Sequence, residues 1–524
     1  MHPGPADPAG PGAAPAAAPA RPGSGGLAGL ARGGLASITG SAVSAGAGVL
    51  VVLAVTRALP QDTAGLFFTL TSIYLIAETA SRLGTGSGVV WAVSRARALG
   101  NARRVPQLMR AACTPVVGLS VLVAAGLVLG ADAIAELVTG SPGGEAAAAT
   151  RVMGLLLPLT AVSDTLVSAT RGYGTVLPTV VVDRLARSVL QLAAVGLVAT
   201  TASLSGLVAA WAAPWVLSSV FAGWWLVRLH RRAERTGAVS ADRPAVSARE
   251  PVPWREFWSF TAPRALTSLV QLALQRLDIV LLAVLAGPAE AAIYTAATRF
   301  LVVGQFANQA LAHVAEPRIG HLLALGDRTG ARTVYQATTA WLVLVTWPFY
   351  LLVASGADAL LDVFGAGYDA GVPVILVLTA TMLVASAIGM VDVVLIMAGR
   401  TSWNLGNALA ALTVNVVLDL LLIPRLGLLG AAIGWAGAIL LKNLLALGQV
   451  HRALGMHPFG VATRTAVLLS VGCFGIPPLA GRLLDGGSLT TALLTAVGGA
   501  VFAAACWHRR GVLALDTLRG TRAG

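Results

Sequence analysis

The segment GADAIAELVTG at residues 130–140 recurs as GADALLDVFG at residues 356–365, 226 positions later. Each copy follows a long apolar run and carries two acidic residues four positions apart. These are Asp132 and Glu136 in the first copy, and Asp358 and Asp362 in the second. Residues four apart share one face of a helix, so we expect a short amphipathic helix in each copy, with its acids facing water. The recurrence predicts that the chain contains an internal duplication.

Other rare residues recur at nearly the same offset. Asp164 matches Asp392, and Arg171 matches Arg400. The segment GLVAAWA at 206–212 matches GAAIGWA at 430–436. Chance matches of alanine and leucine are expected in so apolar a chain, but collinear matches of aspartate, arginine and tryptophan are not. We therefore predict two copies of a six-helix unit, at 36–230 and 260–455, which form two lobes.

The composition is that of a chain whose solvent is mostly lipid. Of its 524 residues 56% are hydrophobic and 11% are charged, whereas a soluble domain has about 25% charged residues. Runs of about 20 apolar residues indicate helices that cross a bilayer. Fourteen such runs lie near 36–56, 64–83, 109–130, 152–170, 178–199, 204–227, 263–286, 291–313, 334–355, 373–397, 403–423, 428–450, 462–481 and 487–507. The predicted fold is an all-α integral membrane protein with two parallel six-helix repeats and two further helices at the C-terminus.

The arginines predict the orientation of these helices. Most of them fall on one set of loops, and the other set holds only Arg57, Arg151, Arg425 and Arg482. Because basic residues accumulate in cytoplasmic loops, both termini are expected in the cytoplasm. An even number of spans in each copy gives both copies the same orientation, as in transporters whose substrate path lies between parallel repeats.

The remaining segments are assigned by composition. Residues 1–35 are expected to be a disordered cytoplasmic tail, because proline, alanine and glycine predominate there. Residues 231–259 are expected to be a cytoplasmic connector, 456–510 the two additional transmembrane helices, and 511–524 a cytoplasmic tail.

No catalytic, cofactor or metal site is predicted. The chain has no GxxxxGK[ST] phosphate-binding loop, and its histidines and three cysteines have neither metal-ligand nor catalytic spacing. The net charge of +13 is spread over loops between apolar runs, so we expect no nucleic-acid partner. The chain is interpreted as a non-enzymatic membrane protein.

Polar residues within the predicted spans are the candidates for function, because they are costly in lipid. On the seventh span five polar residues follow one another at intervals of four, three, four and three positions, which places them in one stripe of a helix. The stripe consists of Arg264, Ser268, Gln271, Gln275 and Asp278. It is expected to line a substrate cavity, or alternatively to join helices by hydrogen bonds. Arg276 lies off this stripe.

The eighth span adds Arg299 and Gln305 to the candidate substrate site. Arginine suits phosphate through bidentate hydrogen bonds, which favours an anionic, phosphate-bearing substrate.

Three carboxylates are candidates for ion coupling: Glu78, Asp164 and Asp392. Glu78 lies four residues from Arg82, so it is alternatively a structural ion pair. The two aspartates sit at matching places in the repeat, where they are alternatively symmetric anchors to Arg171 and Arg400. Asn415 and Asp419, one turn apart on the eleventh span, are interpreted as packing contacts.

Four segments resemble the polysaccharide flippases of the multidrug/oligosaccharidyl-lipid/polysaccharide exporter superfamily. They are TRALPQDTAGLFFTLTSIY at 56–74, LDIVLLAVLAGPAEAAIYTAATRF at 277–300, VFGAGYDAGVPVILVL at 363–378 and NVVLDLLLIPRLGLLGAAIGWA at 415–436. The resemblance covers about 36–455. It implies two helical bundles in a V shape that move an undecaprenyl-pyrophosphate-linked glycan from the inner to the outer leaflet by alternating access. It also implies coupling to a cation gradient or to the membrane potential.

The fourteen predicted spans resemble in number those of the lipid II flippases in that superfamily. There the resemblance implies that the two extra helices line a groove for the lipid tail and that arginines grip the pyrophosphate, for which Arg264 and Arg299 are the nearest candidates. The first span departs from the pattern because it offers serine and threonine but no arginine, so lipid II itself is not assigned as the substrate.

The expected partners are a lipid-linked glycan, membrane lipids, and glycosyltransferases or a polymerase of the same pathway, at a bacterial plasma membrane. Two alternatives stay open: a cation-coupled multidrug exporter of the same fold, and a non-transporting scaffold of a glycan-synthesis complex.

Overall fold

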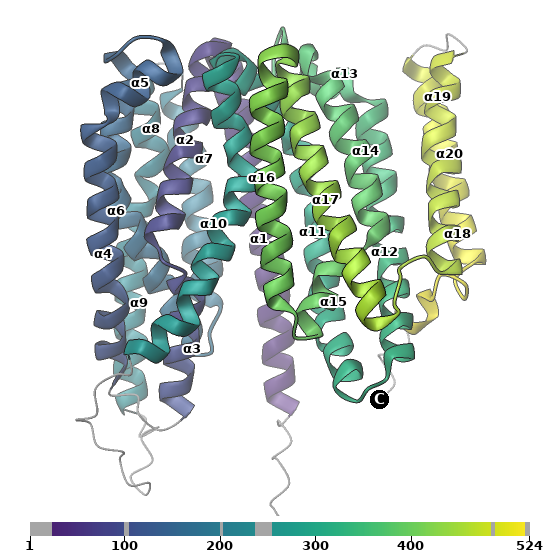
Figure 1. The fold of residues 1–524 in the computed structure, drawn as a ribbon, viewed down its shortest axis with the longest axis horizontal. Helices are drawn as coiled ribbons and strands as arrows, with labels where there is room; N and C mark the ends of the chain where they lie inside the picture. Colours follow the sequence, from purple (N-terminus) through teal and green to yellow (C-terminus); the bar gives the residue numbers. More distant parts are fainter. Residues whose placement is uncertain (1–23, 99–103, 200–202, 236–253, 484–487, 519–524) are drawn as a thin grey trace, which may run out of the picture.

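The two recurring segments lie at the same end of a helical bundle in the computed structural model (Figure 1). They form the short helices α5 (Ala131–Thr139) and α13 (Ala357–Asp362). Ala131, Ala135, Ala357 and Leu361 are buried. The acids Asp132, Glu136, Asp358 and Asp362 are exposed, which confirms the expected amphipathic turns. The structure describes residues 24–98, 104–199, 203–235, 254–483 and 488–518.

The first half of the chain forms ten helical elements in the described residues. They are α1 (Ser24–Ala58), α2 (Gln61–Ser81), α3 (Thr85–Ala98), α4 (Val105–Leu129), α5, α6 (Gly144–Gly172), the π-helix η2 (Thr179–Ala186), α7 (Arg187–Val198), α8 (Leu204–Ala212) and α9 (Pro214–Arg235). Because α1 begins at Ser24, the helix starts twelve residues before the predicted first span. Residues 1–23 of the predicted tail and most of the predicted connector lie outside the described residues.

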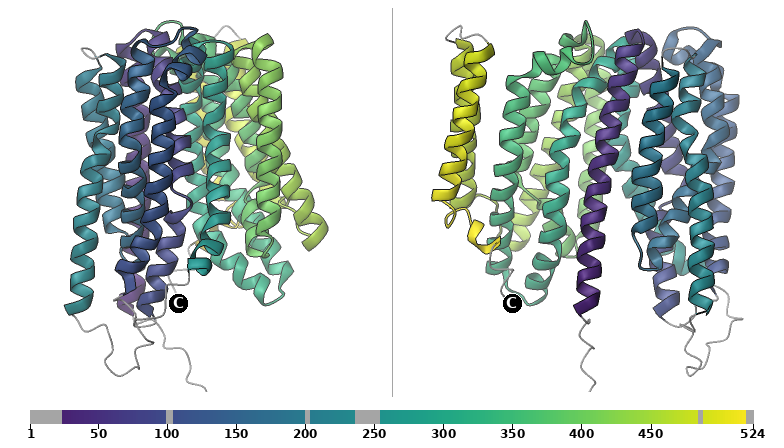
Figure 2. Two further views of the ribbon diagram at one scale, coloured as in Figure 1. Left: turned by 60° about the vertical axis from the view of Figure 1, so that its left-hand side comes forward. Right: turned by 180° about the vertical axis from the view of Figure 1, so that it is seen from behind.

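The second half repeats this order and then adds a hairpin. Its elements are α10 (Trp254–Leu285), α11 (Pro288–Ala324), α12 (Arg328–Ser355), α13, η3 (Tyr368–Gly371), α14 (Val372–Ile388), α15 (Val391–Met397), α16 (Thr401–Leu426) and α17 (Leu428–Leu454). The hairpin consists of α18 (Val461–Ser470), η4 (Val471–Gly475), α19 (Ile476–Leu483) and α20 (Ser488–His508), followed by η5 (Leu515–Leu518). Figure 2 shows α1 along the back of the bundle and the hairpin at one edge, where it packs on α12.

Twelve helices of the described residues are long and apolar enough to cross a membrane. The predicted spans 178–199 and 291–313 also form helices, η2 with α7 and α11, but these are not among the twelve. The all-helical membrane fold is therefore confirmed, whereas apolar length alone does not confirm the count of fourteen.

Each copy breaks a helix that the other copy keeps continuous. In the first copy the chain turns at Leu83 and Gly84, both with positive φ, and so divides α2 from α3. The matching helix α11 runs unbroken over 37 residues. In the second copy Gly389, with φ of 73°, divides α14 from α15, and the matching α6 is continuous. The predicted span 64–83 therefore missed α3 altogether.

The two halves meet along α2, which packs against both α10 and α11. One buried core extends across this contact and includes Phe67 and Tyr74 of the first half together with Ile279 and Ile293 of the second. Near the end that carries the N-terminus of α1, α10 leans toward the first half (Figure 1), where the ring of Phe260 stacks on Trp91 at 4.6 Å. Helix α10 is thus shared between the lobes, and its polar stripe lies close to their junction.

Candidate functional site

A cavity of about 390 Å³ lies within the second lobe. Its lining comes from seven helices, α10, α11, α12, α14, α15, α16 and α17. Three of the predicted site residues, Gln271, Gln275 and Gln305, line it. The volume falls within the range of about 300–1,000 Å³ that is typical of small-molecule sites.

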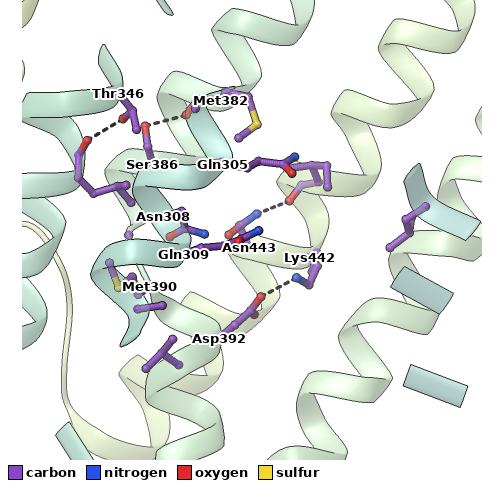
Figure 3. Close-up of a pocket in the computed structure, with 18 of the residues that line it drawn as sticks. Gln305, Asn308, Gln309, Thr346, Met382, Ser386, Met390, Asp392, Lys442 and Asn443 are labelled. Carbon is purple, nitrogen blue, oxygen red and sulfur yellow. Dashed lines mark hydrogen bonds and ion pairs between the residues drawn. The ribbon is translucent and has the colours of Figure 1, made fainter. Parts of the chain in front are cut away.

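Amide side chains predominate among the polar groups of this cavity. They are Gln271 and Gln275 of α10, Gln305, Asn308 and Gln309 of α11, and Asn443 of α17. Figure 3 shows Gln305, Asn308, Gln309 and Asn443 around one space. The sequence placed Gln271 and Gln275 in one stripe and Gln305 in the same candidate site, but Asn308 and Asn443 were not recognised as belonging to it.

The charged side chains of the cavity lining are Asp392 and Lys442, and they pair with each other. The ammonium group of Lys442 lies 2.5 Å from Asp392 Oδ2 (Figure 3). Asp392 stands in the first turn of α15, directly after the break at Gly389. The predicted anchor Arg400 instead lies over the ring of Trp403 at 4.1 Å, so the alternative of an Asp392–Arg400 pair is wrong.

Only Gln271 and Gln275 of the polar stripe on α10 line this cavity. Arg264, Ser268, Gln271 and Gln275 are exposed, whereas Asp278 is buried with 2% of its surface accessible. Tyr294 of α11 donates a hydrogen bond of 2.9 Å to Asp278 Oδ2. The stripe therefore divides into an open section and a buried carboxylate.

Asp278 belongs to a buried cluster with two residues of α16. Asn415 Nδ2 donates a 3.1 Å hydrogen bond to Asp419 Oδ2, and the carboxylates of Asp278 and Asp419 are close enough to repel each other. Asn415 and Asp419 are fully buried. Three of the cluster's oxygens, Oδ1 of each of these three residues, have no hydrogen-bond partner in the described chain.

This cluster has the composition of a site for a proton or a small cation. Two adjoining buried carboxylates repel each other unless a proton or a cation neutralises one of them. Oxygens from carboxylates and an amide are the ligands that hard cations prefer. Helix α17 closes the cluster at Gly434, where a Cβ would lie 2.1 Å from Asp419 Oδ1. The interpretation of Asn415 and Asp419 as packing contacts missed the third member, because Asp278 is 137 positions away in the chain.

The two arginines predicted to bind phosphate lie apart. Arg264 is exposed, donates to the carbonyl oxygen of Phe260 at 2.7 Å, and lies over the Phe260 ring at 3.6 Å. Arg299 is half-buried and donates to the carbonyl oxygen of Thr295 at 3.0 Å. The neighbour of Arg299 is Arg276, close enough for the two charges to repel. Arg276 lies twelve residues from Arg264, about 18 Å along α10.

Arg276 and Arg299 form no ion pair with any carboxylate of the described residues. The ion pairs of the described chain involve other arginines and Lys442. Two neighbouring cations at membrane depth, without acidic partners, form a site that an anion would stabilise.

The first lobe contains the other two candidate coupling residues. Arg82, at the end of α2, lies 3.1 Å from Glu78 and 3.2 Å from Asp164. Asp164 therefore pairs with α2 and not with the predicted anchor Arg171, which donates to Ser168 Oγ at 2.6 Å. The structure thus brings Glu78 and Asp164 together, in the opposite lobe from Asp392.

Comparison with known proteins gives one family match and several structural matches. Residues 30–322, more than half of the chain, match the family model described as "Polysaccharide biosynthesis protein". No curated protein sequence matches the chain. The fold resembles that of the lipid II flippase MurJ in its inward closed conformation, with a TM-score of 0.68 and 11% identity over 91% of this chain and 99% of that one.

The fold also resembles two other transporters of the MOP superfamily. A multidrug resistance MATE family transporter in the inward-facing conformation has a TM-score of 0.60 and 15% identity over 78% of this chain and 95% of its own. A MOP superfamily transporter from Pyrococcus furiosus has a TM-score of 0.55 and 16% identity over 82% of this chain and 95% of its own. The family match and the long apolar helices identify this chain as a multi-pass membrane protein that belongs to the polysaccharide biosynthesis protein family.

Proposed function

We propose that this protein is a flippase that moves a polyprenyl-pyrophosphate-linked saccharide from the inner to the outer leaflet of a bacterial plasma membrane. It would act by alternating access of its two lobes and supply cell-surface polysaccharide or cell-wall synthesis. Membership of the polysaccharide biosynthesis family supports the pathway, and the fold is shared with a lipid II flippase. Glycosyltransferases or a polymerase of that pathway are the partners we propose.

The observation that carries this proposal is the juxtaposition of Arg276 and Arg299. Burying unpaired cations costs free energy, so a membrane protein keeps them only where something offsets that cost. A pyrophosphate offers several anionic oxygens and accepts bidentate hydrogen bonds from guanidinium groups. We assign the phosphate-binding role to this pair. Arg264 is a secondary contact, because it is exposed and lies about 18 Å away along α10.

The charges of the second lobe also bear on the two alternatives. An exporter of organic cations would need an acidic cavity, but the carboxylate of Asp392 is already paired with Lys442. A scaffold without transport would gain nothing from two arginines at membrane depth that have no acidic partner in the described chain. Both alternatives therefore receive less support than the flippase.

We further propose that the cluster of Asp278, Asn415 and Asp419 couples transport to a cation gradient. Each carboxylate predicted from the sequence has a cationic partner: Arg82 for Glu78 and Asp164, and Lys442 for Asp392. Among the described residues the Asp278 cluster has no such partner, and three of its oxygens accept no hydrogen bond. A proton or a small cation bound there would relieve the repulsion between the two carboxylates and favour whichever lobe arrangement holds them together.

A leaflet assay tests the proposed function. Purified protein is reconstituted in liposomes with a fluorescent polyprenyl-pyrophosphate disaccharide, and translocation is read by quenching from outside. Arg276→Gln and Arg299→Gln are each expected to lower the initial rate at least tenfold. Arg299→Lys should fall in between, because it keeps the charge but loses bidentate geometry. Arg318→Gln, at an exposed position of the same α11, is the matched control.

Two results would contradict the proposal. If the wild-type protein moves no polyprenyl-pyrophosphate saccharide above the rate of empty liposomes, the protein is not this flippase. If both glutamine variants transport at the wild-type rate, the arginine pair does not hold the pyrophosphate.

A further inference from the structure

The amides of the second-lobe cavity have hydrogen-bonding capacity that the protein itself does not use. The side chains of Gln271, Gln275, Gln305, Asn308 and Gln309 make no hydrogen bond to the described part of the chain. Other amides of the same lobe bind each other. Asn407 and Gln449, for example, donate to each other reciprocally at 2.8 Å. The cavity therefore presents five free amides, each of which both donates and accepts.

The charge of the cavity selects against ions. Its charged lining residues, Asp392 and Lys442, neutralise each other at 2.5 Å. A free cation or anion would have to compete with that pair. A ligand without net charge keeps the pair intact and uses the amides. Asp392 Oδ1, which is buried and has no hydrogen-bond partner within the described segments, adds one strong acceptor at the wall.

The remaining lining is apolar and partly aromatic. Leu274, Met382, Met390 and Ile439 line the cavity together with Trp435. A ligand with polar edges and carbon–hydrogen faces matches such a mixed wall, because the amides bind its hydroxyl or amide groups and the apolar side chains cover its faces. Saccharide rings, and N-acetylated rings in particular, have this character.

The position of the cavity relative to the arginine pair fits one amphiphilic ligand. Gln275 directly precedes Arg276 on α10. Gln305 follows Arg299 by six residues on α11, which is about 9 Å along the helix. A sugar joined to a pyrophosphate spans a separation of this order.

We propose that this cavity binds an uncharged, hydroxyl- and amide-bearing sugar ring of the transported substrate, with the pyrophosphate held at Arg276 and Arg299. The role of this sugar site in transport rests on the proposed function. Binding of a neutral sugar by the cavity does not, and soluble glycosides test it separately. The substrate class becomes a lipid-linked saccharide whose first sugars carry no net charge.

The test is saturation-transfer NMR on the whole protein in lipid nanodiscs prepared without sugar detergents. The probes are methyl N-acetylglucosaminide and methyl glucoside, with choline and glucuronate as charged probes of similar size. We expect saturation transfer to the neutral glycosides and at least fivefold less to the charged probes. The double variant Gln305→Leu/Gln309→Leu should lose at least fivefold of the glycoside signal, while Gln107→Leu, at an exposed position of α4, keeps it.

A second variant separates loss of binding from misfolding of the double variant. Gln309→Glu changes almost no volume but adds a charge near Lys442, and it should likewise weaken glycoside binding while its melting temperature stays near that of the wild type. Absence of glycoside binding to the wild type, or equal binding by both cavity variants, overturns the sugar site even if lipid-linked saccharides are transported. Glycoside binding without transport supports the sugar site and counts against the flippase assignment alone.

Discussion

Gly65 of α2 lies directly against the carbonyl oxygen of Pro288 at the start of α11. A Cβ at position 65 would sit 1.7 Å from that oxygen, so α2 and α11 approach each other as closely as backbones allow. This contact joins the first lobe to the second.

Gly65→Val is therefore expected to force the lobes apart at this end. Overpacking costs about 1–3 kcal/mol, part of which a change of lobe arrangement would relieve. Spin labels on the exposed faces of α5 and α13 should report a longer or broader distance distribution than in the wild type. The control is Gly118→Val on α4, where a Cβ meets nothing within 4 Å. Unchanged distances in the Gly65 variant would show that the contact does not fix the lobes.

Removing one partner of the Lys442–Asp392 pair should destabilise the protein more than removing both. Either single substitution leaves a charge in a partly buried site, at a cost of about 1–3 kcal/mol. We expect Lys442→Met and Asp392→Asn each to lower the thermal unfolding midpoint and the double variant to recover most of the loss. A double-mutant cycle measures the coupling. Additive losses would mean that the two charges do not stabilise each other.

The melting temperature should no longer depend on cations when a carboxylate of the buried cluster is replaced by an amide. A ligand that binds only the folded protein raises its stability as the ligand concentration rises. Sodium, or failing that a lower pH, is expected to raise the melting temperature of the wild type but not of Asp278→Asn or Asp419→Asn. Asp392→Asn is the control, because its carboxylate has a cationic partner. If Asp392→Asn alone loses the response, coupling lies at Asp392 instead.

The loop between α17 and α18 should open more often at acidic pH, because protonation of His457 destabilises its closed conformation. Burial, and then the charges of Arg332, His451 and Arg464, lower the pKa of this imidazole. Arg332 donates to its Nε2 atom, which accepts only while the ring is neutral.

Because the folded pKa is below the unfolded value of about 6.5, the unfolded chain takes up the proton first and stability falls as pH drops below that value. His457→Gln should remove this part of the pH dependence between pH 7.5 and 5.5, as measured by hydrogen exchange of 455–460. His313→Gln, at an exposed position of α11, should leave it unchanged. Wild-type protection from exchange, corrected for the intrinsic rate at each pH, that does not vary with pH would refute the prediction.

The sequence predicted the helices well because lipid imposes a simple rule. A span must be long, apolar and helical, and all fourteen predicted runs coincide with helices. The break at Leu83 and Gly84 was not predicted, because a leucine rarely adopts a positive φ and nothing in its local sequence announces one. Gly84 there is pressed against α10, where a Cβ would lie 2.6 Å from the backbone nitrogen of Ala265.

The site was only partly predictable for a similar reason. Helical spacing shows which residues share a face of one helix, so Gln271 and Gln275 were recognised together. It carries no information on partners from other helices. Asp164 and Asp392 match in the repeat, yet Arg82 pairs with the first and Lys442 with the second. Likewise Arg276, which lies off the stripe, faces Arg299 only because α10 and α11 form a hairpin.

Lys442 is the only lysine in the chain, and it lies in the cavity wall beside Asp392. Apart from the α-amino group, an amine-specific reagent therefore has a single target in the unaltered protein. The rate at which that target is modified would report, without any engineered reporter, how often the cavity opens to water and whether a transported molecule occupies it.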